Sequence, residues 1–210
     1  GRAIRRAKLP AAYSEGFNPH LKFSLASALG VGVVSYTEFV EIELAEPMEV
    51  EKAALALDAA LPRGIRVLAA DAVDTHHAAL MSQAAGASYR VTLPYSKDVS
   101  VAVAEFNAAP ELLFKKAAPK TKAKFKDIDV KFYIPQLTAE QTETETIFSF
   151  DCKITPTGSM KAVDLLNALN EQYGLALPVE MADIERLRLY RNNKNGKPIP
   201  MLNSDAVTLG

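Results

Sequence analysis

Residues 6–28 read RAKLPAAYSEGFNPHLKFSLASA, and this stretch decides how the N-terminal part of the chain folds. Its basic start runs into Pro10, which cannot continue a helix. Gly16 permits a positive φ, while Pro19 fixes its own φ and moves Asn18 away from the helical region. The stretch therefore predicts the end of a helix, a shaped turn and then a strand.

The turn and its flanks gather polar and basic side chains of the kind that bind anions. His20 is the first candidate, because an imidazole can act as a general base or donate a hydrogen bond to a phosphate. Arg2, Arg5 and Arg6 have the spacing that places them on one face of the expected helix. We predict one positively biased surface that binds an anion, formed by Arg5, Arg6, Tyr13, Ser14, Asn18, His20 and Lys22.

A purely structural role is the alternative for the same residues. The ring of His20 would then bond a backbone carbonyl and brace the turn, with Ser14 as a turn-bonding residue. The arginines would form a solvated helix face. The sequence leaves both interpretations open.

Two further basic groups suggest contacts with RNA. The lysine-rich segment 115–126 resembles a mobile hairpin arm that could bind RNA by counterion release, with Phe125 available to stack on a base. In the last expected strand, Arg186, Arg188 and Tyr190 share a face. The predicted RNA contacts are Lys120, Lys122, Lys124, Lys126, Arg186 and Arg188. The alternatives are a solubilising loop that protects an edge strand and an ordinary solvent-facing strand.

The hydrophobic pattern predicts an α+β fold. We expect helices at 1–8, 50–61, 98–107 and 159–173, and strands at 21–29, 39–44, 65–73, 89–95, 112–116, 128–134, 146–154 and 184–190. This order approximates βαββαβ twice, so we predict two ferredoxin-like halves in tandem, with the first strand of the first half missing. The expected divisions are a first half at 1–75, a linker at 76–87, a second half at 88–191 and a C-terminal tail at 192–210. We expect a tail segment or another chain to cover the place of the missing strand.

Strand alternation and helix periodicity also predict the core. The residues expected to be buried are Val40, Ile42, Leu44, Leu57, Val91, Phe132, Phe148, Phe150 and Leu166. The single cysteine, Cys152, shares strand parity with Phe148 and Phe150. It is therefore expected in the core rather than as a nucleophile.

Composition excludes several classes of protein. Hydrophobic residues make up 49% of the 210 residues and charged residues 23%, which is ordinary for a soluble globular chain. No apolar run reaches the roughly 18 residues that span a bilayer, and no signal peptide is visible, so we expect a cytoplasmic protein and no membrane partner. The net charge of −1 argues against strong non-specific nucleic-acid binding by the whole surface.

No metal site or cofactor is expected in this chain. His76 and His77 are adjacent and would point in opposite directions in a strand, and no spacing matches a known set of metal ligands. One cysteine cannot form an internal disulfide and cannot hold an iron–sulfur cluster by itself.

The motif Arg-Ala-x-Leu-Pro-x-Ala-Tyr-Ser-x-Gly-Phe-Asn-Pro-His at residues 6–20, followed by Gly30 to Gly32 and then Ser35 and Glu38, resembles the radical-SAM-linked protein family. Members of that family occur fused to, or encoded beside, radical SAM proteins. The resemblance implies a radical SAM partner that holds the iron–sulfur cluster and S-adenosylmethionine. The chain departs from the family by having Leu21 after His20, where a proline is usual.

Three classes of function are compatible with these observations. The first is an accessory module for a radical SAM partner, and the second is an RNA-processing protein similar in outline to the endoribonucleases of CRISPR systems, with His20 in its site. The third is a protein–protein adaptor, and a homo-oligomer is compatible with each. The interpretation that combines most observations is a module without catalysis of its own that presents an RNA or another anionic substrate to a radical SAM enzyme.

Overall fold

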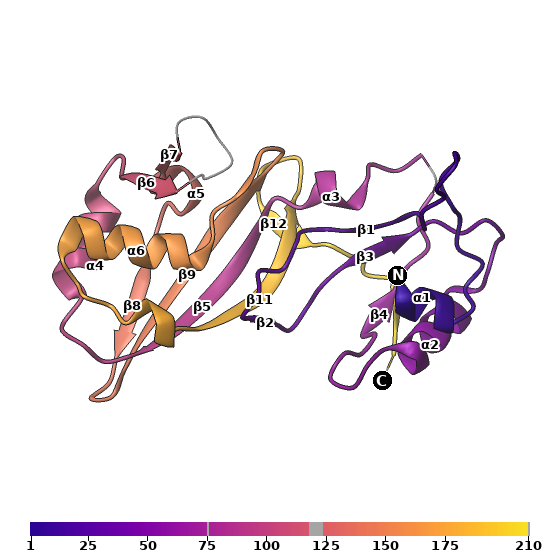
Figure 1. The fold of residues 1–210 in the computed structure, drawn as a ribbon, viewed down its shortest axis with the longest axis horizontal. Helices are drawn as coiled ribbons and strands as arrows, with labels where there is room; N and C mark the ends of the chain where they lie inside the picture. Colours follow the sequence, from indigo (N-terminus) through magenta and orange to yellow (C-terminus); the bar gives the residue numbers. More distant parts are fainter. Residues whose placement is uncertain (75, 118–123, 210) are drawn as a thin grey trace. The chain divides into compact units, whose positions relative to one another are not determined.

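The computed structural model describes residues 1–74, 76–117 and 124–209 (Figure 1). They form two compact units. The first unit comprises Gly1–Ser27, Phe39–Gln83 and Ile199–Gly210, and the second comprises Ala28–Glu38 and Ala84–Pro198. The predicted halves are continuous stretches of chain, whereas each of these units is assembled from separate segments.

The first unit contains short elements. They are α1 (Arg2–Arg6), β1 (Phe23–Leu25), β3 (Val40–Ile42), α2 (Val50–Ala60), β4 (Ala69–Ala70), α3 (Leu80–Gln83) and β13 (Val207–Thr208). Strands β1 and β3 pair antiparallel, and β13 pairs antiparallel with β4. The C-terminal tail therefore adds a strand beside β4, in a two-stranded sheet separate from β1 and β3. The covering of a missing first strand stays a prediction.

The second unit contains the larger sheet. Its elements are β2 (Val33–Ser35), β5 (Gly86–Pro94), α4 (Ser100–Ala108), β6 (Leu113–Ala117), β7 (Phe125–Asp129), α5 (Val130–Tyr133), β8 (Thr138–Gln141), β9 (Glu145–Thr155), β10 (Gly158–Ser159), α6 (Ala162–Tyr173), the 3₁₀ turn η1 (Val179–Met181) and β11 (Asp183–Asn192). Strand β12 (Pro198–Pro200) joins this sheet beside β11. The α+β class is thus confirmed.

The central strands of this sheet lie in the order β8–β9–β5–β11, with every neighbouring pair antiparallel. Helix α4 lies between β5 and β8 in the chain, and α6 lies between β9 and β11. Figure 1 shows both helices against the sheet of this unit. Apolar side chains from both helices and from β5, β9 and β11 form one core, so the helices cover one face of the sheet.

Alternation predicts the core of the second unit well. Val91, Phe148, Phe150 and Leu166 are all buried. The hydrophobic face of α6 packs onto the sheet, and the helix ends at Gly174, which adopts the left-handed conformation with φ 57°.

The predicted strand at 128–134 is wrong. The carboxylate of Asp129 accepts hydrogen bonds from the backbone N–H groups of Leu112 and Lys131, which ends β7 and begins the short helix α5. Val130 and Ile134 are then both buried at helical spacing, while Phe132, predicted to be buried, is 51% exposed.

The predicted core of the first unit is also only partly correct. Val40 is 43% exposed, and its cross-strand neighbour Leu25 is 45% exposed. Ile42, Leu44 and Leu57 are half-buried. The physical reason is the size of the sheet, since β1 and β3 pair only with each other among the described strands. Phe23, Leu25 and Val40 share one face of this pair and are all exposed.

Candidate functional site

The predicted turn is a closed loop at the tip of an antiparallel pair of segments. The backbone N–H of Ser14 donates to the carbonyl of His20 at 2.8 Å, and the N–H of His20 donates to the hydroxyl of Ser14 at 2.9 Å. Gly16 has φ 113°, a conformation that side chains rarely adopt. The turn is therefore shaped by its own residues, as the sequence indicates.

The candidate residues lie in the two paired segments on either side of the turn, and they fall on different faces of this pair. Tyr13 forms a bridge with Leu21, so their side chains share one face. His20 and Lys22, two residues apart in an extended segment, share the opposite face. By this alternation, His20 and Lys22 are expected on one side of the paired segments and Tyr13 on the other.

Lys22 has a carboxylate partner on the neighbouring strand. Its Nζ lies 2.9 Å from Oε1 of Glu43, and both side chains are about half exposed. The hydrogen bond that the ammonium of Lys22 donates to Glu43 raises the pKa of Lys22. Exposed pairs of this kind contribute little to stability, so Lys22 can exchange this partner for another anion at small cost.

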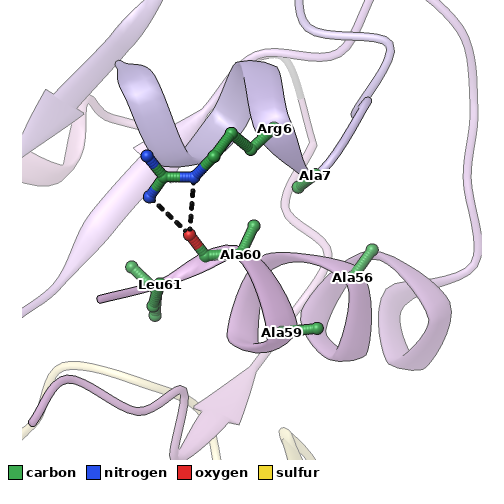
Figure 2. A pocket seen from close by; sticks show the side chains of 6 residues that line it. All are labelled: Arg6, Ala7, Ala56, Ala59, Ala60 and Leu61. Carbon is green, nitrogen blue, oxygen red and sulfur yellow. Dashed lines mark hydrogen bonds between the residues drawn. The ribbon is translucent and has the colours of Figure 1, made fainter. Parts of the chain in front are cut away.

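Arg6 contacts the end of helix α2. Its Nε and Nη2 donate to the carbonyl oxygen of Ala60 at 3.2 and 2.7 Å, at the C-terminal end of α2 (Figure 2). A cation there suits the negative end of the helix dipole. The shallow pocket beside it is otherwise lined by Ala7, Ala56, Ala59, Ala60 and Leu61, whose side chains offer no polar group to a ligand. Arg5 is exposed. The shared anion surface of Arg5, Arg6, Tyr13, Ser14, Asn18, His20 and Lys22 stays a prediction.

The lysine-rich segment forms a hairpin of β6 and β7, as the sequence suggests. Lys116 stands directly opposite Lys126 in the register, and Lys115 stands opposite Asp127. Lys115, Lys124 and Lys126 are exposed, while Lys116 pairs with Asp164 of α6. Lys120 and Lys122 lie outside the described residues.

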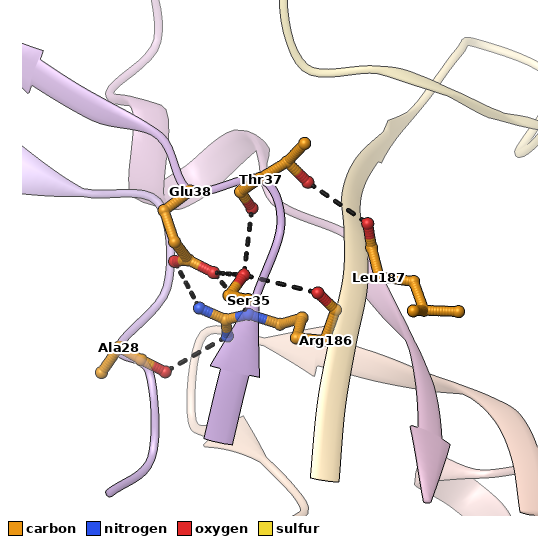
Figure 3. A network of polar contacts seen from close by, with 6 residues as sticks. All are labelled: Ala28, Ser35, Thr37, Glu38, Arg186 and Leu187. Atoms are coloured by element: carbon orange, nitrogen blue, oxygen red, sulfur yellow. Dashed lines mark hydrogen bonds and ion pairs between the residues drawn. The ribbon is translucent and has the colours of Figure 1, made fainter. Parts of the chain in front are cut away.

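Arg186 is not the exposed RNA contact that strand parity predicted. Its side chain is 1% exposed and forms a bidentate ion pair with Glu38, through Nε at 2.9 Å and Nη2 at 2.5 Å (Figure 3). Nη1 donates to the carbonyl of Ala28 at 3.3 Å. Burial by itself would lower the pKa of this guanidinium, but Glu38 and Tyr89 raise it above its ordinary value.

The physical reason for the wrong parity is an irregularity in β11. Its register with β5 shifts between Arg186 and Arg188, so the two arginines no longer share a face. Arg188 is exposed and donates to the hydroxyl of Ser88 at 2.9 Å. Tyr190 is buried.

Sequence reasoning missed the partners of Arg186. Glu38 and Ser35 belong to the Ser-x-x-Glu part of the motif, and the hydroxyl of Ser35 bonds both the Glu38 carboxylate and the carbonyl of Arg186 (Figure 3). Strand β2 pairs in parallel with β11 at these residues. A buried arginine needs a carboxylate, but a separation of 148 residues gives no local signal for this pair.

The face of the sheet opposite the helices carries a second polar group, which was not predicted from the sequence. Nε of Arg90 donates to Oε2 of Glu185 at 2.7 Å, and the hydroxyl of Tyr36 donates to Oε1 of the same carboxylate at 2.5 Å. The hydrogen bonds from Arg90 and Tyr36 lower the pKa of Glu185. Alternation in β5 was the available signal, because Val91 and Leu93 point inward and Arg90 must point outward.

Cys152 and His77 are the remaining candidates for a nucleophile and a metal ligand. Cys152 is buried, and burial raises the pKa of its thiol to about 11. Nδ1 of His77 donates to the carbonyl of Asp74 at 2.6 Å, and its Nε2 lies 2.9 Å from Oε2 of Glu41. In the part of the chain that the structure describes, no three His, Cys, Asp or Glu side chains gather closely enough to hold a metal ion.

None of the described helices has both the length and the apolar character that crossing a membrane requires.

A comparison with protein families shows which family the chain is related to. Residues 1–164 match the family described as an uncharacterized protein conserved in bacteria, DUF2344. The chain belongs to this family. A search of curated proteins finds no match. The part of the chain that matches DUF2344 includes the Ser14–His20 turn, the Ser35 and Glu38 positions and the β6–β7 hairpin, whereas Arg186 lies beyond it.

Proposed function

We propose that this DUF2344 chain is an accessory module, without catalysis of its own, that holds an RNA or another anionic substrate for a radical SAM partner enzyme. The partner would bind the iron–sulfur cluster and S-adenosylmethionine. The support for the partner is the resemblance of residues 6–38 to proteins linked to radical SAM enzymes. With one cysteine, the chain does not fit a Cys-held cluster of its own.

The observation that carries the RNA part of the proposal is the charge register of the β6–β7 hairpin. Residues 113–129 contain six lysines and two aspartates. Like charges directly opposite each other, as at Lys116 and Lys126, destabilise a strand pair. Asp164 offsets one of the two charges, and a polyanion would offset the rest. RNA phosphates are therefore a suitable ligand for this surface.

The fold of the second unit supports the same proposal. Its antiparallel order β8–β9–β5–β11, with helices on one face only, is the arrangement that a ferredoxin-like half would have, and we propose that this unit is one. The uncovered face then offers Arg90, Tyr36 and Arg188 to a ligand, which is how sheet-based RNA modules bind unpaired nucleotides.

The surroundings of His20 favour a module without catalysis over an endoribonuclease. General acid–base catalysis needs a histidine held by an orienting partner. Among the described residues, the hydrogen bonds at His20 are made by its backbone and not by its ring. A cleavage assay on end-labelled tRNA and rRNA tests the alternative, and we expect no cleavage by the chain alone.

RNA binding is tested by mobility shift of total tRNA across 50–300 mM salt. We expect the triple variant Lys115→Ala, Lys124→Ala, Lys126→Ala to bind more weakly, and to reduce the slope of log affinity against log salt by about 2, because each lost phosphate contact of a single strand reduces it by about 0.7. The matched control replaces three exposed lysines elsewhere, Lys52, Lys161 and Lys194, and should change the slope little. Equal effects of the two triple variants would contradict a role for the hairpin.

The partnership is tested separately. An affinity-tagged chain, expressed in a bacterium that encodes the family, should co-purify with a radical SAM protein, identified by mass spectrometry and by its iron content. Repeated recovery of the chain without such a protein would leave only the RNA part of the proposal.

A further inference from the structure

Phe17 is the most exposed large apolar side chain in the described part of the chain. Its exposed fraction is 112%, so it is at least as accessible as it would be in an unfolded peptide. It stands at the tip of the closed turn, next to Gly16 with its positive φ. The two hydrogen bonds between Ser14 and His20 hold this turn in place, so the ring is presented by a shaped structure.

A presented ring of this kind binds at low conformational cost. A phenylalanine has few rotatable bonds, and the closed turn already restricts the backbone that carries it. Both faces of the ring are open to solvent, so a planar group can lie against either one. The turn therefore offers a stacking platform.

The neighbours of Phe17 indicate which planar group it fits. Asn18 and His20 follow Phe17 in the same turn and are exposed, and they carry an amide and an imidazole, which can donate and accept hydrogen bonds at the edge of a base. A pocket-filling anchor in a protein interface is usually surrounded by other apolar side chains that exclude water. Here the adjacent side chains are polar, and Glu15 would oppose insertion into an anionic lipid surface.

We propose that Phe17 stacks on an unpaired base of an RNA strand, with Asn18 and His20 placed to bond the edge of that base or its phosphate. This inference rests on the proposed RNA-binding function and assigns a base contact to the turn, while the β6–β7 hairpin supplies contacts to phosphates. Aromatic residues bind single-stranded RNA in this way because every base has a π-face.

The test uses two fluorescein-labelled probes of 12 nucleotides, oligo(A) and a chain of abasic ribose phosphates. Phe17→Ala should bind oligo(A) about 10-fold more weakly, which corresponds to about 1.4 kcal/mol. It should bind the abasic probe as the parent does. Phe17→Trp should keep the affinity for oligo(A). The control is Val31→Ala, which shortens another fully exposed apolar side chain between two glycines and should change neither affinity.

Each outcome separates the two proposals. If the parent chain binds neither probe and no tRNA, the proposed RNA-binding function fails, and this inference fails with it. If the parent prefers oligo(A) but Phe17→Ala keeps that preference, RNA binding stands and the assignment of Phe17 is wrong. If Phe17→Ala leaves both RNA affinities intact but abolishes co-purification of a partner protein, the ring is a protein anchor and the inference is overturned.

Discussion

Arg186 has its positive charge in the interior of the second unit. The hydrogen-bond acceptors around it determine whether that charge stabilises or destabilises the folded state. Glu38 supplies two carboxylate oxygens, and Ala28 supplies a carbonyl. Arg186 is buried, whereas the Glu38 side chain is 32% exposed. An ion pair with a buried member is weak evidence for stability by itself, because desolvation offsets much of the attraction. Removing one partner is costly, because it leaves a buried charge without a counterion.

We therefore expect Glu38→Gln to lower the free energy of unfolding by about 3 kcal/mol, as measured by urea denaturation. The double variant Glu38→Gln, Arg186→Met should recover a large part of that loss, since methionine brings no charge into the core. A double variant that is no more stable than the single one would show that the ion pair is not the source of the effect.

Cys152 provides a pH dependence whose sign follows from burial. Desolvation raises the pKa of its thiol from the ordinary value of 9.0 to about 11. Between these values the folded state binds more protons than the unfolded state, so the free energy of unfolding falls as the pH rises from 9 to 11. The contribution is fully present below pH 9.

The expected loss from this thiol is about 2–3 kcal/mol by pH 11. Urea denaturation of the parent and of Cys152→Ala at a series of pH values isolates it, because the other titrating groups are common to both proteins. We expect the difference in stability between the two proteins to shift in favour of the alanine variant over this range. Parallel pH profiles would contradict a buried, protonated thiol.

At the scale of elements, long and regular patterns were predictable and short elements were not. Alternation in β5 and β9 and the period of α6 are strong enough to predict their buried faces. The 128–134 segment is ambiguous in sequence because Val130 and Ile134 fit both a strand and a helix turn, and the Asp129 cap decides between them. The burial of Arg186 depends on a register shift and on a partner 148 residues away, and neither can be recognised from the local sequence.

Phe150 tests the packing of β9 against the helices. Its ring is 6% exposed and stacks on Tyr89 with 5.5 Å between ring centroids. Phe150→Ala should lower the free energy of unfolding by about 3–5 kcal/mol, the usual range for a buried phenylalanine. The control is Phe132→Ala, which removes a half-exposed ring and should cost less than about 1 kcal/mol. Equal melting temperatures for Phe150→Ala and the parent would show that the strand parity is wrong.

At the scale of the whole molecule, the tail belongs to the first unit although it follows the second unit in the chain. Val207 and Thr208 pair with Ala70 and Ala69, and the N–H of Leu209 donates to the carbonyl of Leu68 at 2.9 Å. Without this neighbour, the backbone amides of a strand as short as β4 would have little protection from hydrogen exchange. The tail therefore stabilises residues that lie more than a hundred positions earlier in the sequence.

Deleting residues 205–210 should accordingly affect one unit only. We expect faster amide hydrogen exchange in peptides that cover 66–72, because they lose their strand partner. Peptides from β5 and β9 serve as the internal control and should exchange as in the full chain. Unchanged exchange at 66–72 would mean that β13 does not protect β4.

The assembly of each unit from separate segments also sets an order for folding during synthesis. Strand β2 completes its pairing only with β11, and Ser35 and Arg186 are 151 residues apart. At roughly 5–20 residues per second, a ribosome needs about 8–30 s to make the intervening chain. Throughout that interval the nascent segment with Val31, Val34 and Tyr36 has no strand to join, and the first unit still lacks its last strand. A chaperone at the ribosome exit would therefore meet an unpaired apolar segment long before either unit can close.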